Sequence, residues 1–321
     1  MKITVLIITY NNEKTINKLI QSINTYIGSS VCEILVLDNS QNLETVKVIS
    51  MLQDNKVKLI HNDLNFGYRR ALNMGVKISS NEIILVLNPD VELLDGCIEK
   101  CVDYVYKHED AAYCFPNSTD VETYGINAGG NFGVPFLSYS LVKKDRIDGD
   151  EFYNVDIGGG AVFVIKKSIY IKAGGLDESI FMYDEEEELA YKFANLGKRI
   201  VAHTSCKVFH EGGHSTKSYE NYNHLIYTWL EAKKFLYKKY VHDDKLHKLI
   251  WMILFLFIVI EYSFFFKTKS FFKVIFNSRD VKPSGFTGIF FPKWNLVSFF
   301  VNTLVTIKRL KKKYGGYHFR R

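Results

Sequence analysis

The stretch Ile83–Asp90 reads IILVLNPD, and it indicates the fold class that the rest of the chain supports. The apolar, largely β-branched run predicts a strand that is buried on both faces. The tripeptide Asn88-Pro89-Asp90 predicts a turn at the carboxyl end of that strand. A carboxylate in this position suits a divalent cation that also binds a nucleotide diphosphate, because Mg²⁺ takes few protein carboxylates and completes its shell with phosphate and water. The alternative is an Asx-turn between strand and helix.

Short apolar runs of the same kind alternate with helical patterns through the first 110 residues. The expected strands are Ile3–Thr9, Glu33–Leu37, Lys56–His61 and Glu82–Leu87, and the expected helices are Glu13–Thr25, Tyr68–Ile78 and Leu94–His108. This alternation predicts an α/β fold with a mostly parallel sheet, right-handed crossovers and flanking helices. Ligands bind at the carboxyl ends of the strands in such sheets. The polar residues after the first, second and fourth strands are therefore expected to share one crevice.

The second half of the chain is less regular at first and then helical. Residues 110–165 are rich in glycine and predict irregular structure. An acidic helix is expected at Asp184–Leu196, followed by an apolar strand at Ile200–Phe209. The sequence then becomes helical and aromatic, so we place a domain boundary near residue 230, between a domain at 1–230 and a helical, aromatic and basic region at 231–321.

Charge is divided unevenly along the chain. The net charge is +6, but residues 267–321 hold 13 Lys and Arg against Asp280 alone, so this tail carries +12 and residues 1–266 carry −6. A composition with 47% hydrophobic residues and 5 prolines excludes a disordered chain, a collagen-like chain and a small disulfide scaffold. A basic cluster can bind nucleic acid, but this one adjoins long aromatic runs without a nucleic-acid-binding motif, so we expect no nucleic-acid partner.

The segment Leu249–Phe266, which reads LIWMILFLFIVIEYSFFF, suggests contact with a membrane. Its length is at the lower limit for a membrane-spanning helix, and Glu261 would be costly in hydrocarbon. We therefore favour a helix that is docked on the protein or lies in the membrane interface. Aromatic runs beside clustered Lys and Arg are typical of proteins that contact an anionic membrane surface. The expected location is cytoplasmic, at the inner face of the cell membrane, and peripheral rather than spanning.

The cysteines agree with a reducing compartment. There are 5, an odd number, and no CxxC pair is present. The N-terminal apolar run is too short for a signal peptide and is interpreted as a strand. Together these features predict a protein of the reducing cytosol. Cys97 and Cys101 are four residues apart on an expected helix and are interpreted as buried on one face.

Two further polar segments are candidates for ligand binding. Asp38 ends a buried strand, where its carboxylate can accept hydrogen bonds from a base or a ribose, or can cap a turn. The segment Asn65–Gly75, NFGYRRALNMG, opens a helix with small residues. A helix N-terminus attracts phosphate, and Arg69 and Arg70 are expected to add positive charge there. Ordinary helix capping is the alternative.

Acidic and imidazole side chains supply candidates for chemistry. Five consecutive acids, Asp184–Glu188, stand at the start of a helix. The helix dipole favours acids there, but five exceed what capping needs, and one carboxylate near a cation can act as a general base. His210 ends an apolar strand and can bind the cation as a neutral imidazole, or it can be structural.

In their order and spacing, these motifs resemble the inverting glycosyltransferase family 2, of GT-A fold, and within it the bacterial rhamnosyltransferase-like enzymes of surface-polysaccharide synthesis. The resemblance covers about residues 1–240. It is carried by VLIITYNN at 5–12, VLDNS at 36–40, NFGYRRALNMG at 65–75, NPDVEL at 88–93, the segment 158–200 that begins GGGAVFVIKK, and VFHEGGHS at 208–215. It implies a GT-A (nucleotide-diphospho-sugar transferase) fold for the first domain.

The resemblance also implies roles for individual residues. The donor nucleotide sugar would be bound by Thr9, Tyr10, Asn11, Asp38, Asn65, Gly67, Arg70, Asn88, Gly159 and Gly160. Asp90 would be the metal-binding member of a DXD-type motif that here reads Asn-Pro-Asp, and His210 would lie near the metal and the diphosphate. The implied cofactor is Mg²⁺ or Mn²⁺.

The family's catalytic base is the aspartate of a Glu-Asp pair at the start of the acidic helix. Matching Tyr183 and Leu189 to the family pattern places that pair at Glu185-Glu186, so Glu186 is the implied base and Glu185 the second candidate. Glutamate in place of aspartate moves the carboxylate by about 1.5 Å, comparable to misplacements that cost ~100-fold in rate. The acceptor pocket would have to compensate for this departure.

The implied activity is a metal-dependent, inverting transfer of a sugar, with rhamnose favoured. The donor would be a nucleotide-diphosphate sugar and the acceptor a saccharide or lipid-linked saccharide, in synthesis of O-antigen, capsule or another surface polysaccharide. One alternative is a UDP-hexose or galactofuranose transferase of the same fold. Another is a non-catalytic nucleotide-sugar-binding scaffold, which the glutamate at 186 keeps open. A nucleotidyltransferase would require a Gly-rich phosphate loop after the first strand, which is not found there.

Overall fold

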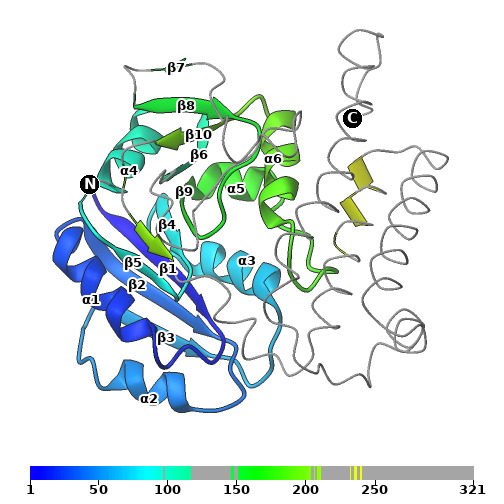
Figure 1. The fold of residues 1–321 in the computed structure, drawn as a ribbon. Helices are drawn as coiled ribbons and strands as arrows, with labels where there is room; N and C mark the ends of the chain where they lie inside the picture. Colours follow the sequence, from blue (N-terminus) through cyan, green and yellow to red (C-terminus); the bar gives the residue numbers. More distant parts are fainter. Residues whose placement is uncertain are drawn as a thin grey trace, which may run out of the picture. The chain divides into compact units, whose positions relative to one another are not determined.

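The structure of the chain is a computed structural model. It describes residues 1–96, 98–116, 146–147, 151–203, 206 and 208–210, with five further positions between 232 and 240. The chain divides into two compact units, one of Met1–Gly130 with Val142–Ser218 and one of Asn131–Leu141 with Tyr219–Arg321. The fold described below belongs to the first unit (Figure 1). The expected boundary near residue 230, the segment Leu249–Phe266 and the basic tail lie outside the described residues.

A parallel sheet forms the first half of the unit. Its strands are β1 (Ile3–Thr9), β2 (Val31–Asp38), β3 (Val57–His61) and β4 (Ile83–Leu87), in the order β3-β2-β1-β4, and every adjacent pair is parallel. All seven residues of β1 and all five of β4 are buried, as expected for strands covered on both faces. The four strands predicted for this part of the chain are confirmed.

The sheet continues past β4 with strands from the glycine-rich middle and the later chain. They are β9 (Val162–Lys166), β6 (Ala111–Pro116), β10 (Arg199–His203), β8 (Phe152–Val155) and β7 (Arg146–Ile147), in that order. The pair β6-β10 is parallel, and the other junctions are antiparallel. Residues 110–165 are therefore not wholly irregular as predicted. The glycines in this segment indicate turns, and the strands between them are too short to be recognised from the sequence pattern.

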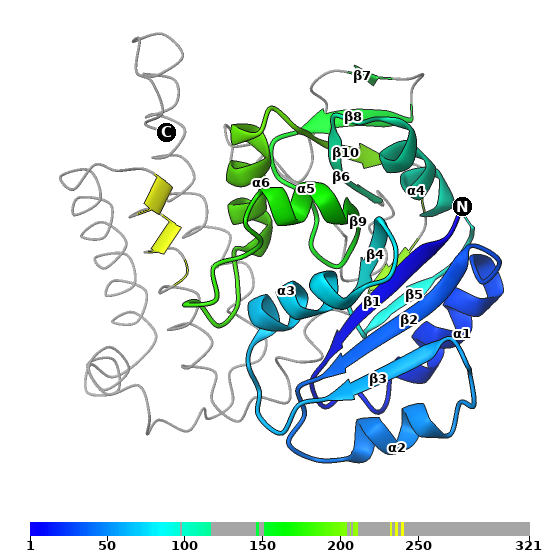
Figure 2. The same cartoon turned by 180° about the vertical axis from the view of Figure 1, so that it is seen from behind.

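Helices cover both faces of the sheet. They are α1 (Ile16–Tyr26), α2 (Glu44–Ser50), α3 (Tyr68–Ile78), α4 (Ile98–Lys107), α5 (Lys167–Lys172) and α6 (Glu185–Asn195). Alternate residues of β1 such as Val5 belong to one core together with α1 and α4. Leu6 points to the opposite face, where a Cβ at Gly75 of α3 would lie 2.4 Å from its Cδ1. Figure 2 shows α3, α5 and α6 beside one another.

A second, two-stranded sheet corrects one prediction. The apolar run expected to form a single strand at Ile200–Phe209 is divided between β10, in the large sheet, and β11 (Val208–His210), which pairs antiparallel with β5 (Val91–Leu93). Apolar, β-branched sequence indicates extended backbone but not the sheet that the backbone joins. The pairing aligns His210 with Val91, next to Asp90.

The described helices can also be compared with the thickness of a bilayer. None of those in the part of the chain that the structure describes is long and apolar enough to cross a membrane.

Candidate active site

The carboxyl ends of β1, β2 and β3 meet at one buried carboxylate. Asp38 is fully buried, and its Oδ1 accepts hydrogen bonds from Thr9 Oγ1 at 2.8 Å and from Ser40 Oγ at 2.5 Å. Its Oδ2 lies 2.9 Å from His61 Nδ1. The predicted convergence of Thr9 and Asp38 is confirmed. Asp38 thus links the ends of the three strands through hydrogen bonds to protein side chains.

The loop after β1 presents the next two predicted residues. Asn11 adopts a left-handed conformation with φ of 55°, which asparagine tolerates better than most residues. Its N–H donates to Ser40 Oγ at 2.8 Å, and the Tyr10 N–H donates to Asn12 Oδ1, also at 2.8 Å. Both residues are half-buried. Strain of this kind is often kept at ligand-binding loops.

The start of α3 is fixed to the segment that precedes the acidic helix. Asn65 Oδ1 accepts the Gly67 N–H at 3.0 Å, and Gly67 caps the helix with φ of 82°. A Cβ at Gly67 would lie 2.3 Å from the Phe181 carbonyl oxygen, and that oxygen accepts the Tyr68 N–H at 3.1 Å. Glycine is thus required for both its conformation and the close approach. The first N–H of this helix is bonded to protein.

The two arginines of α3 have different environments. Arg69 is fully buried and donates to Glu188 Oε2 and, at 2.7 Å, to the Tyr183 carbonyl oxygen, with its Nε 3.7 Å from Glu185 Oε1. The expectation that Arg69 adds positive charge for phosphate is therefore wrong. Its charge is neutralised by Glu188 of α6.

Arg70, the other arginine of this pair, is on the surface. Its guanidinium lies 4.4 Å from the centre of the Phe66 ring, and its Nε is 4.0 Å from Glu178 Oε2. With a side chain that is 57% exposed, Arg70 is accessible to a ligand.

Asp90 and His210 meet at the end of β4. Asp90 is 8% exposed, and its Oδ1 lies 3.2 Å from His210 Nε2. The two side chains come from β11 and from the turn between β4 and β5, which are 120 residues apart in the chain and are joined by the small sheet. Sequence reasoning selected both residues, and the structure places them together.

The predicted base lies beside the predicted glycines. Because β4 and β9 are antiparallel, with Leu87 opposite Val162, the residues before β9 flank the end of β4, and the Asn88 N–H donates to the Ala161 carbonyl oxygen at 2.8 Å. A Cβ at Gly160 would lie 1.5 Å from Glu186 Oε1. The Glu186 carboxylate therefore lies against the bare backbone of Gly160, which directly precedes the residue bonded to Asn88. The carbonyl of Gly159 accepts the Tyr113 hydroxyl.

The two buried glutamates at the start of α6, Glu185 and Glu188, differ in the direction of their pKa shifts. Burial raises the pKa of Glu185 to about 8, against the attraction of Arg69 and with the help of Glu186. Burial would also raise the pKa of Glu188, but Lys192 and Arg69 together hold it below its ordinary value. Glu185 and Glu188 are thus buried beside Arg69, whereas Glu186 is half-buried and lies next to Gly160.

Backbone strain precedes these acids. Tyr183 and Asp184 have φ of 80° and 59°, two successive non-glycine residues in the left-handed region. Each such residue costs on the order of 1 kcal/mol or more and persists only where its surroundings enforce it. The hydrogen bond from Arg69 to the Tyr183 carbonyl is one of the contacts that hold this turn. The predicted helix start at Asp184 is one residue early, since Asp184 is the N-cap.

One site residue, His61, was missed because it looked ordinary in sequence, and the role of another, Arg69, was predicted wrongly. His61 ends β3 and holds Asp38, and Arg69 holds the acids of α6. A signal for Arg69 was present: with Leu72 and Val76 it occupies positions i, i+3 and i+7 of α3, and all three are buried.

Comparison with known proteins places the chain in a family. Residues 4–174, more than half of the chain, match the family described as Glycosyl transferase family 2. The chain therefore belongs to glycosyltransferase family 2.

Several proteins similar in sequence to this chain are named as sugar transferases. The low-salt glycan biosynthesis hexosyltransferase Agl10 of Haloferax volcanii is 28% identical over 59% of this chain and 61% of its own length. Rhamnosyltransferase WbbL of Escherichia coli is 21% identical over 67% and 85%, respectively. The N-acetylglucosaminyl-diphospho-decaprenol L-rhamnosyltransferase of Mycobacterium tuberculosis is 24% identical over 66% and 76%. The chain thus spans less than two thirds of the first of these relatives.

Solved structures agree on the fold. The structure of GalNAc-T7 with UDP, GalNAc and Mn²⁺ superposes with a TM-score of 0.56 at 17% identity, over 65% of this chain and 44% of that one. S. aureus TarS gives a TM-score of 0.51 at 16% identity, over 84% and 45%. The predicted GT-A fold is confirmed.

Proposed function

We propose that this chain is an inverting glycosyltransferase that moves a sugar, with rhamnose favoured, from a nucleotide-diphosphate donor to a saccharide acceptor. The observation that carries the proposal is the arrangement around the end of β4. There Asp90 meets His210, and the neighbouring start of β9 supports Glu186 at Gly160. A pair suited to a cation and a candidate base thus flank the same strand end, where ligands of α/β sheets bind.

The residues present fit a divalent cation. In an octahedral shell with oxygen ligands at 2.0–2.1 Å, two neighbouring ligand atoms would be about 2.8–3.0 Å apart. Asp90 Oδ1 and His210 Nε2, at 3.2 Å, match this separation closely. An imidazole ligand favours a transition-metal ion such as Mn²⁺ over Mg²⁺. When bound, such an ion would supply positive charge that stabilises the departing nucleotide diphosphate.

The chain's own residues have separate tasks in the proposed reaction. Glu186, as a carboxylate, accepts the proton of the acceptor hydroxyl, and the hydroxyl oxygen then attacks the anomeric carbon from the face opposite the nucleotide. The C–O bond to the new sugar forms as the bond to the diphosphate breaks, so the configuration inverts. The buried Arg69 holds the start of α6 in place through its hydrogen bonds to Glu188 and to the Tyr183 carbonyl oxygen.

Glu185 is less suited to the role of base. Its pKa of about 8 keeps it protonated at neutral pH, and its carboxyl is buried toward Arg69. We therefore assign the base to Glu186 and a positioning role to Glu185. The donor nucleotide would lie along Thr9, Tyr10, Asn11 and Asn65, above Asp38, with Arg70 at the rim.

The names of relatives support the finer proposal. Two are rhamnosyltransferases, and one of these acts, by its name, on a diphospho-decaprenol, a lipid-linked acceptor. We propose that this chain also uses a lipid-linked saccharide in surface-polysaccharide synthesis, at the cytoplasmic face of the membrane. The +12 tail at 267–321 would attract the anionic surface. The hexosyltransferase of Haloferax volcanii favours a hexose as the second candidate sugar.

A donor panel tests the proposed function. The purified full-length chain would be incubated with Mn²⁺ or Mg²⁺, a lipid-linked acceptor and, in turn, dTDP-rhamnose, UDP-hexoses and UDP-galactofuranose, and product would be followed by mass spectrometry. We expect transfer from dTDP-rhamnose that requires the cation. Nucleotide-sugar binding without transfer or hydrolysis of any donor would instead identify a scaffold. Flotation with anionic liposomes tests the membrane proposal separately, and protein that stays at the bottom of the gradient would contradict it.

A further inference from the structure

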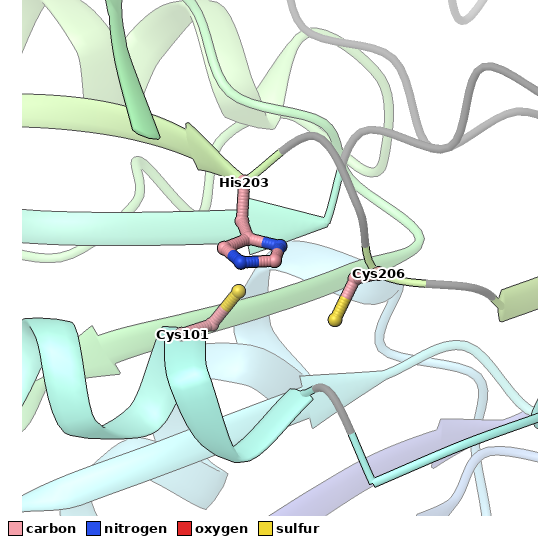
Figure 3. A group of neighbouring side chains, drawn as sticks. All are labelled: Cys101, His203 and Cys206. Carbon is pink, nitrogen blue, oxygen red and sulfur yellow. The ribbon is translucent and has the colours of Figure 1, made fainter. Parts of the chain in front are cut away.

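Three potential metal ligands lie together away from the candidate active site. Cys101 is in α4, His203 is the last residue of β10, and Cys206 is in the connection toward β11. One ligand atom from each residue lies within 4.8 Å of the other two, and all three residues are at most 1% exposed. Figure 3 shows both sulfur atoms on the same side of the His203 ring.

The surroundings hold the histidine in place. The Phe152 ring packs edge-on against the His203 ring, with centroids 4.7 Å apart, and Phe152 in turn stacks on Tyr104 of α4. A carboxylate oxygen of Glu151 lies 3.6 Å from His203 Nε2, and Glu151 also binds Lys100. A carboxylate beside the ring is the usual outer partner of a metal-bound histidine.

From this cluster we propose a second metal site, in which Cys101, His203 and Cys206 bind a soft divalent ion, with zinc as the expected occupant. Two thiolates and an imidazole are a common donor set for zinc. With Zn–S of 2.3 Å and Zn–N of 2.0–2.1 Å, tetrahedral ligand atoms are about 3.5–3.8 Å apart. The cluster therefore needs to contract by roughly 1.3 Å at most from the 4.8 Å limit. Water would complete the shell.

Charge balance favours such a site in this core. Cys101 and Cys206 belong to the main hydrophobic core. An isolated charge there would be costly, but two thiolates neutralise a divalent cation. The site would tie α4 to the connection that leads into β11. It differs in donor chemistry from Asp90 and His210, which offer one oxygen and one nitrogen, so the two sites would select different ions.

Two other readings of the cluster exist. Buried cysteines often act only as small apolar side chains, and Cys101 and Cys206 could form a disulfide under oxidising conditions. The described cysteines form no disulfide in this structure. The three readings differ in the combination of metal content and thiol count, so one experiment separates them.

The test is metal analysis of the full-length protein with matched variants. Wild type is expected to carry one zinc ion per chain after gel filtration, and C101S and C206S to lose it. C114S removes another fully buried cysteine, in β6, and is expected to retain zinc. D90N, which disrupts the other site, is also expected to retain it. Circular dichroism would show whether each variant folds. The cobalt test needs no variant: Co²⁺ added to metal-free wild type should give a thiolate-to-cobalt charge-transfer band.

Three results would overturn the proposal. They are wild type without stoichiometric zinc and without the cobalt band, zinc retained in folded C101S and C206S, and a denatured, unreduced wild-type chain that titrates with three thiols in place of its 5. The first result would identify ordinary buried thiols, and the last a disulfide.

Discussion

Replacing Gly160 by alanine should displace the proposed base while leaving the fold intact. The new Cβ would lie 1.5 Å from Glu186 Oε1, whereas ordinary van der Waals contact begins at 3.4 Å. The carboxylate must therefore retreat by roughly 1.9 Å. Because the carboxylate is the end of a flexible side chain, the movement is expected to cost on the order of 1 kcal/mol in rotamer strain. The melting temperature should then fall by about 2–4 °C.

The effect on the rate should be far larger. A misplacement of about 1 Å at a reacting group can cost ~100-fold in rate, so a retreat of roughly 1.9 Å should reduce kcat at least that much. The assay is steady-state transfer with the donor identified by the panel, together with calorimetric measurement of nucleotide affinity, which should change little. Gly96→Ala serves as the control, because its Cβ would meet only the Tyr26 carbonyl oxygen at 3.4 Å.

A double-mutant cycle separates this effect from direct contact of Gly160 with substrate. If Gly160 acts by positioning the Glu186 carboxylate, G160A should not lower kcat further in the E186Q background, because the two substitutions remove the same contribution to the rate. Wild-type kcat in G160A would refute the reasoning. Fully additive losses in the double variant would also refute it.

Three further predictions follow from the site. Arg69→Met breaks the buried ion pair with Glu188 and leaves Lys192 as the remaining cationic partner of that carboxylate, so it should lower the free energy of unfolding by about 3–5 kcal/mol in urea titrations; the exposed Arg70→Ala should change it by less than about 0.5 kcal/mol, and equal losses would contradict the buried role of Arg69. The pKa of Glu185 is raised from 4.5 to about 8, so between these pH values the folded chain holds a proton that the unfolded chain has lost, and the free energy of unfolding should fall as the pH rises from 4.5 to about 8. E185Q should flatten this dependence on pH, and an unchanged dependence would exclude Glu185 as its source. His210→Asn should raise the Mn²⁺ concentration needed for half-maximal transfer by ~10-fold or more, whereas His108→Asn, at the end of α4, should not; equal metal dependence would remove His210 from the cation site.

The strands that carry the site could be predicted because their residues are mostly apolar, and in β4 entirely so. Runs such as Ile83–Leu87 have few other stable environments than a sheet covered on both faces. The polar residues that end these runs, Asp38 and Asp90, were found for the same reason, since carboxyl ends of parallel strands share one edge.

The remaining features depend on contacts that are distant in sequence. His210 was selected as the end of a long strand, but its place beside Asp90 comes from a break after His203 and pairing in a separate sheet. Arg69 next to Arg70 resembled a phosphate-binding pair, and only the helical phase of α3 distinguishes the buried arginine from the exposed one. Cys101 and Cys206 are likewise far apart in sequence and show no motif, so only the fold brings them together.

The most direct test of the account is the transfer rate of Glu186→Gln. This substitution keeps the size of the side chain and its seat at Gly160 and removes the proton acceptor, so the account predicts a loss of about 100-fold to 10,000-fold in transfer. Nucleotide affinity should stay at the wild-type value, because Glu186 is not assigned to the donor nucleotide. Transfer by E186Q at the wild-type rate would contradict the account and move the base to another residue.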